Sequence, residues 1–535
     1  MITIITFIYI ILSLLNQFII IYGMIPVQCG YNLTRRIPVC CPLSNINGKV
    51  CGGPKYGECI QIWTPKEKVP SVFLIDDRID WPKRYFTHFC QCFGNYFGAA
   101  CDECWFGWKG QHCNKRSIKI RRDIKTLTDR ELYIFKRLIV LSQTWPSGYL
   151  LIDESDNWNV DPLTKPKLEH ASVQYYITYL HRYGSRSTLY KNVQDCEDYG
   201  ILNFNHDGVC FPIWHRYYNL LWERLMTKIA IQVFGISDYA TPYWDWIGLR
   251  HCDICTNRYI GAPGRRSEMG LHISSGSPFS NLTEYCYEPM KDLLCSGCQK
   301  GGKGIITREF KKGNLPDVED LKFVLSLEKF HVPGERLSPV CLSFNIALEG
   351  FCGRPGADPN HRWFHNKIHV LIDGSMCCTA TASNDPLFIL HHTFIDKIFE
   401  VKGFCGRPGA DPNHRWFHNK IHVLIDGSMC CTATASNDPL FILHHTFIDK
   451  IFECWLKTYN PSPEEYPDKH VRPGHSRYSF IVGIIPLARN IDFFTPLTNF
   501  GVYYDNKIFG RYAEDGRPPF YCSKMDTIMK GSYYY

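Results

Sequence analysis

The chain of 535 residues lacks several features that mark nucleic-acid-binding and membrane proteins. It has no run of lysine and arginine, and its formal net charge of +7 is modest for this length. A nucleic-acid partner therefore has no support. No second apolar run of about 20 residues follows the N-terminal one, so we expect no stable membrane span in the mature chain. Patterns typical of β-strands are also few, which favours a mainly α-helical fold.

The one long apolar segment lies at the N-terminus. Residues 2–22 carry no charge, and small and polar residues follow up to residue 28. This pattern is typical of a cleaved signal peptide, here residues 1–28, with an uncleaved anchor as the alternative. The 26 cysteines fit an oxidising compartment, and Asn32 and Asn281 each begin an N-x-Thr glycosylation acceptor. We therefore expect a secreted protein, located outside the cell or in the lumen of the secretory pathway.

A disulfide-rich module is predicted to follow at residues 29–115. Ten cysteines lie between Cys29 and Cys113, and a long stretch without cysteine comes next. The close spacing of the last few resembles an EGF- or laminin-like module. Ten cysteines allow five bridges, but the spacing does not give their pairing. A zinc ribbon at Cys101 and Cys104 is the less favoured alternative in a secreted chain.

From residue 116 the hydrophobic pattern changes to the period of helices. Residues 127–142 open with Thr-Asp-Arg-Glu, which is an N-terminal capping signal. Residues 261–315 are rich in Gly, Ser and Pro and predict a long loop. A helical domain with metal ligands on facing helices is a known use of the four-helix bundle. Further helices are predicted at 172–183, 214–231, 366–372 and 386–399, the last two recurring at 419–425 and 439–452.

One block of sequence occurs twice without a single difference, as residues 350–400 and 403–453. In the first copy, His365 and His369 are four residues apart, so on a helix both imidazoles reach one metal. A pair of histidines ending at His392 follows in the same copy. Perfect identity differs from the diverged repeats of solenoid proteins. It indicates a recent duplication or an error in the assembled gene.

A second set of histidines lies upstream of the repeat. His181 ends an aromatic helical segment, and His206 and His215 follow nine residues apart. Each of them alone could be a hydrogen-bonded histidine of the core. The Pro-Tyr-Trp-Asp-Trp segment at 242–246, together with all three histidines, favours metal ligands instead.

These motifs in combination resemble the tyrosinase family, in particular the animal tyrosinases and tyrosinase-related proteins. The resemblance implies a dicopper domain at 116–475, followed by a C-terminal extension at 476–535. The similarity runs through Cys40-Cys41-Pro42, Cys90-Gln91-Cys92, Cys252-Asp253-Ile254-Cys255, Leu348-Glu349-Gly350-Phe351, both histidine blocks and Gly474-His475.

The resemblance also implies two copper ions, with O2 as co-substrate, because imidazole suits copper and two ions together supply two electrons to O2. By family position, the first copper is held by His181, His206 and His215. The second is held by His365, His369 and His392, and the duplicate set is His418, His422 and His445.

Glu349 matches the family position thought to orient a water near the coppers. Asn366 matches the residue thought to work with that water as a base for an incoming phenol. Two departures stand out. Asn219 replaces a usually apolar residue, and Phe204 occupies the position at which some members link a cysteine to a copper histidine.

The leading interpretation is therefore a secreted tyrosinase acting on small phenols such as tyrosine or catechols, with protein-bound tyrosine as a further substrate class. The products would serve pigment formation (melanin) or protein cross-linking. The alternatives are a zinc-containing tautomerase, an O2 carrier, and a paralogue impaired by the duplication. We expect the first copy of the block to be used, because Glu349 precedes it. The second copy has the more typical downstream sequence, and mixed use is the third arrangement.

Overall fold

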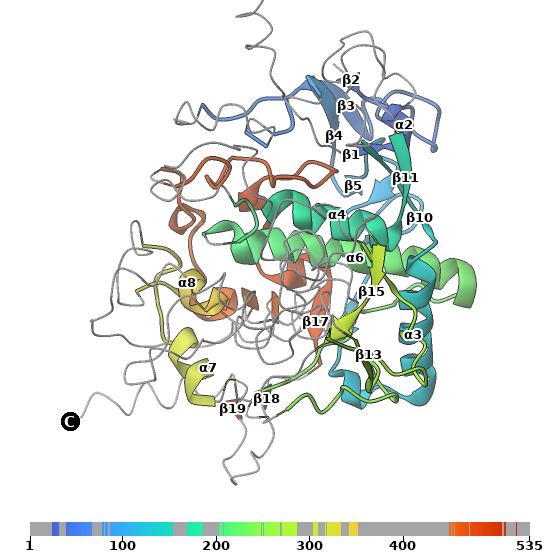
Figure 1. Ribbon diagram of the computed structural model, residues 1–535. Helices are drawn as coiled ribbons and strands as arrows, with labels where there is room; N and C mark the ends of the chain where they lie inside the picture. Colours follow the sequence, from blue (N-terminus) through green and yellow to red (C-terminus); the bar gives the residue numbers. More distant parts are fainter. Residues whose placement is uncertain are drawn as a thin grey trace, which may run out of the picture.

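The computed structural model describes most of the chain between residues 24 and 350 and most of its C-terminal part (Figure 1). The rest, including Asn32 and the repeated block before Asp449, lies outside the described residues. The described residues are 24–30, 39–66, 78–79, 81–83, 86–152, 168–185, 203–206, 208–247, 249, 251–267, 270–285, 303–308, 316, 318–332, 342–350, 449–450, 452–453, 455–469, 471–505, 508–509 and 520–521.

The cysteine-rich module is present where the cysteine spacing predicts it. Strands β2, β4 and β3 form one sheet, and β5 pairs with β6 and β7 with β8. Their bounds are β2 Val39–Cys40, β3 Gly57–Gln61, β4 His88–Cys92, β5 Tyr96–Phe97, β6 Glu103–Cys104, β7 Trp108–Lys109 and β8 Lys115–Arg116. All ten cysteines are bonded, as Cys29–Cys40, Cys41–Cys59, Cys51–Cys90, Cys92–Cys101 and Cys104–Cys113.

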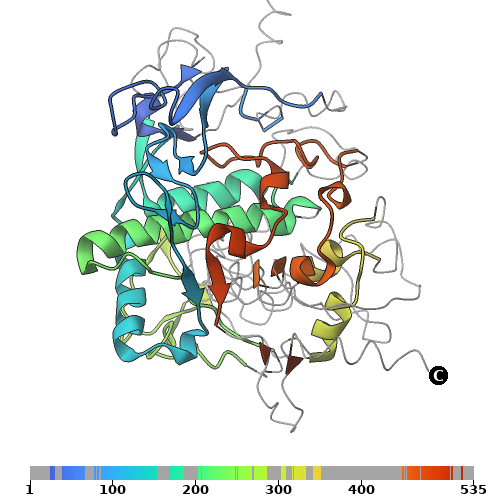
Figure 2. The same ribbon diagram turned by 180° about the vertical axis from the view of Figure 1, so that it is seen from behind.

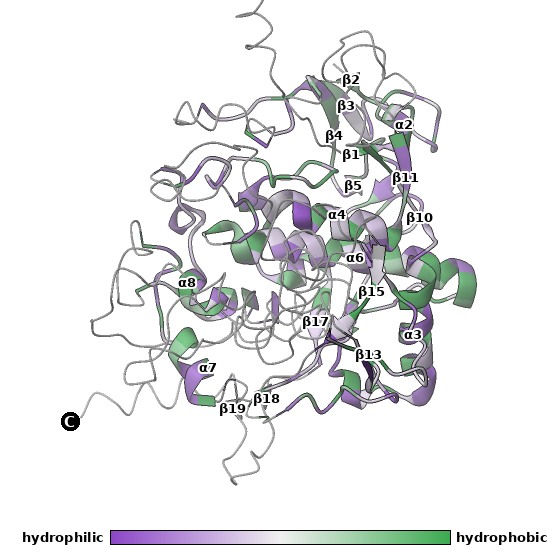
Figure 3. Ribbon diagram, in the orientation of Figure 1, coloured by the Kyte–Doolittle hydropathy of each residue, from purple (hydrophilic) through white to green (hydrophobic). Residues whose placement is uncertain are grey.

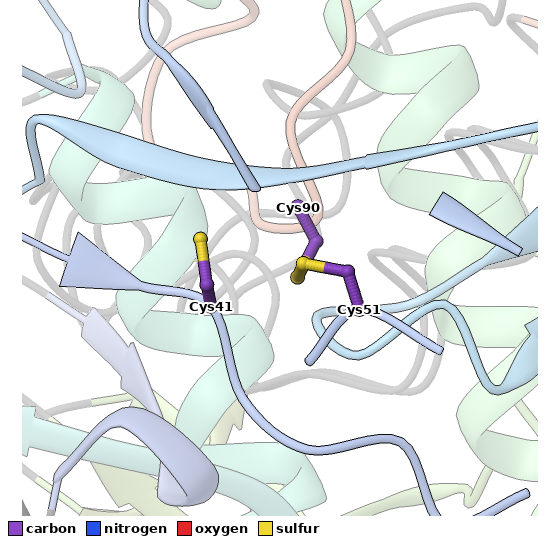
Figure 4. Close-up of side chains that lie close together, drawn as sticks. All are labelled: Cys41, Cys51 and Cys90. Atoms are coloured by element: carbon purple, nitrogen blue, oxygen red, sulfur yellow. A yellow bond between two sulfur atoms is a disulfide. The ribbon is translucent and has the colours of Figure 1, made fainter. Parts of the chain in front are cut away.

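Three sulfur atoms of this module lie close together, those of Cys41, Cys51 and Cys90 (Figure 4). Cys51 and Cys90 are bonded to each other, and Cys41 belongs to a neighbouring bridge. The thiolate is the form that binds a metal, so bonded sulfurs of this kind do not form a zinc site. The zinc-ribbon alternative fails for the same reason, because Cys101 and Cys104 are each part of a bridge.

Helix α3 begins where the capping signal predicts. After the short helix η2 (Ile124–Thr126) it spans Asp129–Ser142. The Glu131 backbone N–H donates to the Thr128 hydroxyl at 3.3 Å, and the Thr128 N–H donates to the Glu131 carboxylate at 2.8 Å. These two bonds satisfy donors that a helix start leaves open.

Two helices cross the centre of the fold, α4 (Val173–Ser185) and α6 (Cys210–Phe234). They lie side by side in Figures 1 and 2, and the Tyr218 hydroxyl of α6 donates to the Ile177 carbonyl of α4 at 3.1 Å. Both carry hydrophilic residues among the apolar ones (Figure 3). Helix α6 begins at Cys210, before the predicted start at residue 214. Pro212 falls in its first turn, where a missing N–H is tolerated, so the proline does not prevent this earlier start.

The prediction of a mainly α-helical fold is wrong, because helix makes up 33% and strand 21% of the structure. Part of the predicted loop at 261–315 forms strands instead, which are only two to five residues long. Strands this short are hard to recognise from apolar alternation. They are β12 Pro263–Ser267, β13 Gly270–Ile273, β14 Thr283–Tyr285, β15 Lys303–Ile305 and β16 Thr307–Arg308.

Strand β1 (Met24–Pro26) lies within the predicted signal peptide. It pairs with β10 (Pro146–Ile152), which in turn pairs with β11 (Leu168–Ser172), and the short helix α2 (Val27–Gly30) follows β1. Met24 and Ile25 are buried. Cleavage after residue 28 would therefore remove a strand from this sheet, so residue 28 as the boundary remains a prediction.

Helices α7 (Val318–Leu325) and α8 (Phe344–Glu349) lie near the helical residues 455–459 (Figure 2). The rings of Phe344 and Trp455 stack at 5.5 Å, and the Trp455 indole N–H donates to the Leu327 carbonyl at 3.2 Å. Segments on either side of the repeated block therefore pack against each other. The predicted bundle helices inside that block lie outside the described residues, apart from the end of the second copy.

Residues 476–505 pack onto the domain that precedes them. Strand β17 (Val502–Tyr504) pairs in parallel with β9 (Lys119–Arg121), and β18 (Ile508–Phe509) pairs with β19 (Phe520–Tyr521). Within the described part of the chain, no helix is both long and apolar enough to cross a bilayer. The short helices here are η7 Pro463–Glu465, η8 Asn490–Phe493 and η9 Leu497–Phe500.

Candidate metal centre

Three buried histidines meet between the two central helices. His181 lies on α4, His215 on α6, and His206 in the segment that precedes α6. Their side chains are exposed by no more than 3%, and one ring nitrogen from each lies within 4.8 Å of the other two. The Nε2 atoms of His181 and His206 are 3.3 Å apart. The structure thus brings together the first predicted ligand set.

Neighbouring oxygens orient two of these rings. Nδ1 of His215 lies 2.7 Å from the Phe211 carbonyl, so it carries the proton and donates. Nδ1 of His206 lies 2.9 Å from the side-chain oxygen of Asn205, whose amide nitrogen donates to the His181 carbonyl at 2.9 Å. Protons on both Nδ1 atoms leave a lone pair on each Nε2. Such partners fix the tautomer of metal-binding histidines, so this donor set fits a metal ion that prefers imidazole.

The segment that carries His206 is held by residues that sequence reasoning missed. The side-chain oxygen of Asn203 accepts from the backbone N–H of His206 at 2.8 Å, and its backbone carbonyl accepts from Nε2 of His475 at 2.8 Å. A side chain at Gly208 would meet the His475 ring at 2.8 Å. His475 belongs to the Gly-His motif, but only the structure shows that it supports this segment. Asn205 was detectable as the residue directly before a candidate ligand.

Aromatic side chains exclude water from the site. The rings of Phe211 and Trp214 lie 4.8 and 5.0 Å from the ring of His215, and the ring of Tyr218 lies 6.3 Å from that of His181. All three are buried, and burial raises the pKa of Tyr218 well above its ordinary value. These three rings therefore form an apolar wall on the described side of the site.

Of the other predicted site residues, Glu349 alone lies in the described part of the chain. It is fully buried at the end of α8, which stops at Gly350 in a left-handed conformation. Asn366 and both copies of the second ligand set lie outside the described residues. That set comprises His365, His369 and His392, with the duplicates His418, His422 and His445.

Asn219 lies one turn after His215 on α6 and is fully buried. Within the described part of the chain, neither polar atom of its side chain has a hydrogen-bond partner. A buried amide without partners is costly. The departure from the family pattern noted in the sequence therefore falls on the same helix face as a predicted ligand.

A cluster of buried charges adjoins the histidines. Nε of Arg121 lies 3.0 Å from Glu223, and Nη1 of Arg121 lies 3.1 Å from Asp449. Arg216, the residue after His215, donates through Nε to the other oxygen of Asp449, and its Nη2 lies 3.6 Å from Glu453. Two residues of the second repeat copy thus face the helix that carries His215.

Opposite charges offset part of the cost of burial in this cluster. Burial lowers the pKa of Arg121, but Glu223, Tyr504 and Asp449 together hold it above the ordinary value. Burial raises the pKa of Asp449 to about 7, although Arg216 and Arg121 act in the opposite direction. The Asp449 carboxylate therefore depends on its two arginine partners to stay ionised.

A metalloprotein with a buried three-histidine site between two helices is thus defined by the structure. The family model "Common central domain of tyrosinase" matches residues 171–401 and, a second time, residues 402–458. The tyrosinase of Gallus gallus is 30% identical over 90% of this chain and 82% of its own. That of Bos taurus is 29% identical over 93% and 83%. The chain belongs to the tyrosinase family.

A more distant relative and one solved structure are also similar to this chain. The 5,6-dihydroxyindole-2-carboxylic acid oxidase of Mus musculus is 27% identical over 91% of this chain and 83% of its own. A recombinant mushroom tyrosinase of known structure aligns with 79% of this chain and 67% of its own, at 16% identity and a TM-score of 0.37. The latter similarity is too low to support an assignment by itself.

Proposed function

We propose that the protein is a copper oxidoreductase with tyrosinase activity. It hydroxylates monophenols and oxidises o-diphenols to o-quinones with O2, acting as monophenol monooxygenase and catechol oxidase. The observation that carries the proposal is the buried triad of His181, His206 and His215, in which the Nδ1 contacts of two rings place the ring lone pair on Nε2. In a member of the tyrosinase family, this triad is the half of the dicopper site that the described residues contain.

The triad would hold the first of two copper ions, and three histidines of the repeated block would hold the second. These are His365, His369 and His392 or their duplicates His418, His422 and His445. Bound copper would supply the electrons that reduce O2. The chain itself fixes the ring orientations through Asn205 and the Phe211 carbonyl, and excludes water through the aromatic residues around the site.

Glu349 and Asn366 would handle the phenol proton. Glu349 is fully buried at the end of α8, and a carboxylate that holds a water can accept the proton of a bound monophenol. Asn366 would complete the hydrogen bonding of that water. Catechol oxidation needs less help from such a base, so the two residues separate hydroxylation from oxidation.

Substrates are proposed to be small phenols such as tyrosine or catechols, or tyrosine in proteins, for melanin formation or cross-linking. The location is proposed to be extracellular or in the lumen of the secretory pathway. Six disulfides among the described residues support an oxidising compartment. Asn281 is exposed, as a glycosylation acceptor must be.

Metal analysis of the protein purified from a secreting host tests the proposal. We expect two copper ions per chain and a near-ultraviolet absorption band when hydrogen peroxide is added. His215→Ala should abolish activity while most of the helicity remains. Two zinc ions, together with no such band after copper loading, would favour the tautomerase alternative and contradict the proposal, since imidazole binds both metals.

A further inference from the structure

The two copies of the repeated block are identical, so only the structure distinguishes their places in the fold. We infer that the C-terminal end of the second copy, and not that of the first, is built into the core beside helix α6. The described residues of that end are Asp449, Lys450, Phe452 and Glu453, which are exposed by no more than 3%. Their twins in the first copy are Asp396, Lys397, Phe399 and Glu400.

Asp449 carries most of the argument. Its two carboxylate oxygens accept from two guanidinium groups, Oδ1 from Nε of Arg216 and Oδ2 from Nη1 of Arg121 at 3.1 Å. Nη2 of Arg216 also donates to the Asp449 backbone carbonyl at 3.3 Å. Arg216 directly follows His215. This aspartate therefore fixes the second copy next to the first ligand set.

The other residues of this end have partners of their own in the core. Nζ of Lys450 donates to the Tyr243 hydroxyl at 2.9 Å. The Phe452 ring lies under the guanidinium carbon of Arg216, 4.0 Å from its centre. The Glu453 carboxylate accepts from the backbone N–H of Leu497. Arg216 is thus shared by Asp449 and Phe452, whereas Tyr243 and Leu497 are additional partners of Lys450 and Glu453. Together these contacts specify a single placement of the segment.

The first copy cannot make the same contacts in the same molecule. Both guanidinium groups already face the Asp449 carboxylate in a buried space, so Asp396 is excluded from this position. Glu349, which precedes the first copy, is also fully buried. The upstream end of one copy and the downstream end of the other are therefore both in the core, which favours mixed use over use of the first copy alone.

A consequence for the second copper rests on the proposed function. His445 precedes Asp449 by four residues, a spacing that places two side chains on the same face of a helix. Asp449 itself contacts α6 through Arg216, the residue that follows His215. We therefore expect His445, which belongs to the copy whose end docks beside α6, rather than the corresponding His392, to be the third ligand of the second copper.

Substitutions at corresponding positions of the two copies test both the docking of the second copy and the ligand assignment. In each pair of variants, the substitution in the first copy is the control. Deleting residues 350–402 or residues 401–453 gives the same sequence, so deletions cannot tell the copies apart. In the metal-free full-length protein, Asp449→Asn should lower the unfolding temperature by about 5 to 10 °C, because it leaves two buried guanidinium groups without their shared carboxylate. Asp396→Asn should leave the unfolding temperature unchanged.

The histidine pair is then compared by metal analysis after copper loading. His445→Ala should reduce the copper content from two ions per chain to one, and His392→Ala should leave it at two. If Asp449→Asn does not fold while Asp396→Asn does, the docking inference is supported. Equal effects of the two aspartate substitutions, or a larger effect of Asp396→Asn, would overturn it.

The docking inference and the ligand assignment can fail separately. Loss of one copper in His392→Ala but not in His445→Ala would overturn the ligand assignment. If the aspartate pair behaves as expected and the unsubstituted protein binds no copper, the docking inference stands and the proposed function fails.

Discussion

Asn205 bridges two of the three clustered histidines. Its side-chain oxygen accepts from Nδ1 of His206, and its amide nitrogen donates to the backbone carbonyl of His181, both at 2.9 Å. Asn205→Leu should weaken copper binding at the first site by about tenfold to a hundredfold, as is typical when a partner of a metal-bound histidine is lost. Titration against a chelator measures this change. Asn499→Ala, at an exposed position, is the control, and equal affinities in both variants would contradict the bridging role.

Glu349 offers a test that separates two activities. If its carboxylate takes the phenol proton through a water, Glu349→Gln should reduce monophenol hydroxylation by about a hundredfold or more. Catechol oxidation should fall much less. The ratio of kcat values for a monophenol and the matching catechol measures the difference. Equal losses on both substrates would show that this buried carboxylate is only structural.

Replacing Asn219 by leucine should stabilise the folded protein. Its buried side-chain amide has no hydrogen-bond partner among the residues that the structure describes, so Asn219→Leu should raise the free energy of unfolding of the metal-free protein by about 1 to 2 kcal/mol. Thermal denaturation of both proteins measures this. A drop in the unfolding temperature would mean that the amide is needed for the fold. The same substitution also shows whether activity depends on an amide beside His215.

The ion pairs of Glu103 indicate how the stability of the folded protein should change in acid. It links the cysteine-rich module to α6 through Lys228 at 2.7 Å and Arg224 at 3.0 Å. Burial raises its pKa, but the two cations outweigh this effect and lower the pKa from 4.5 to about 2. The two ion pairs of Glu103 therefore contribute their full stabilisation above about pH 4.5, and this contribution is lost as the pH falls towards 2.

Unfolding temperatures of the wild type and Glu103→Gln at several pH values test this prediction. The wild type should be the more stable protein at pH 6, and the difference should shrink between pH 4.5 and 2 because only the wild type loses the ion pairs there. A constant difference across this range would contradict the lowered pKa of Glu103.

Removing one copy of the repeat tests whether the extra copy is surplus. A chain without residues 401–453 places Glu349 before a single block, which then continues into Cys454 as the second copy does. This variant should fold in higher yield and oxidise catechols at least as fast as the full-length chain. Soluble yield and catechol oxidase activity are the measurements. An inactive variant beside an active full-length chain would show that both copies are needed.

Features with a strong local signal were predictable from the sequence. Thr128 and Glu131 form the capping box that their spacing indicates, and the cysteine count predicted five bridges in the N-terminal module. His181, His206 and His215 were assigned through the family resemblance, and they do meet in one buried cluster. Spacing alone could not show this, because the three residues lie on separate elements.

Other features depend on contacts between distant segments. The pairing of the cysteines, the short strands β12 to β16, and the support of Asn203 by His475 leave no periodic pattern in the sequence. The role of Asp449 is the clearest case. The corresponding Asp396 is preceded by the same residues back to Gly350 and followed by the same four residues. The immediate sequence therefore does not distinguish the two aspartates, whereas the contact of Asp449 with Arg216 does.

The parallel pairing of β9 with β17 has a mechanical consequence. Lys119 lies opposite Val502, and Arg121 opposite Tyr504, in strands that run in the same direction. Tension that pulls the chain before β9 and the chain after β17 apart would slide these strands along each other. All hydrogen bonds of the pair would then carry the load together, in shear, rather than opening one after another. The domain between them is thus held at its two ends against such forces.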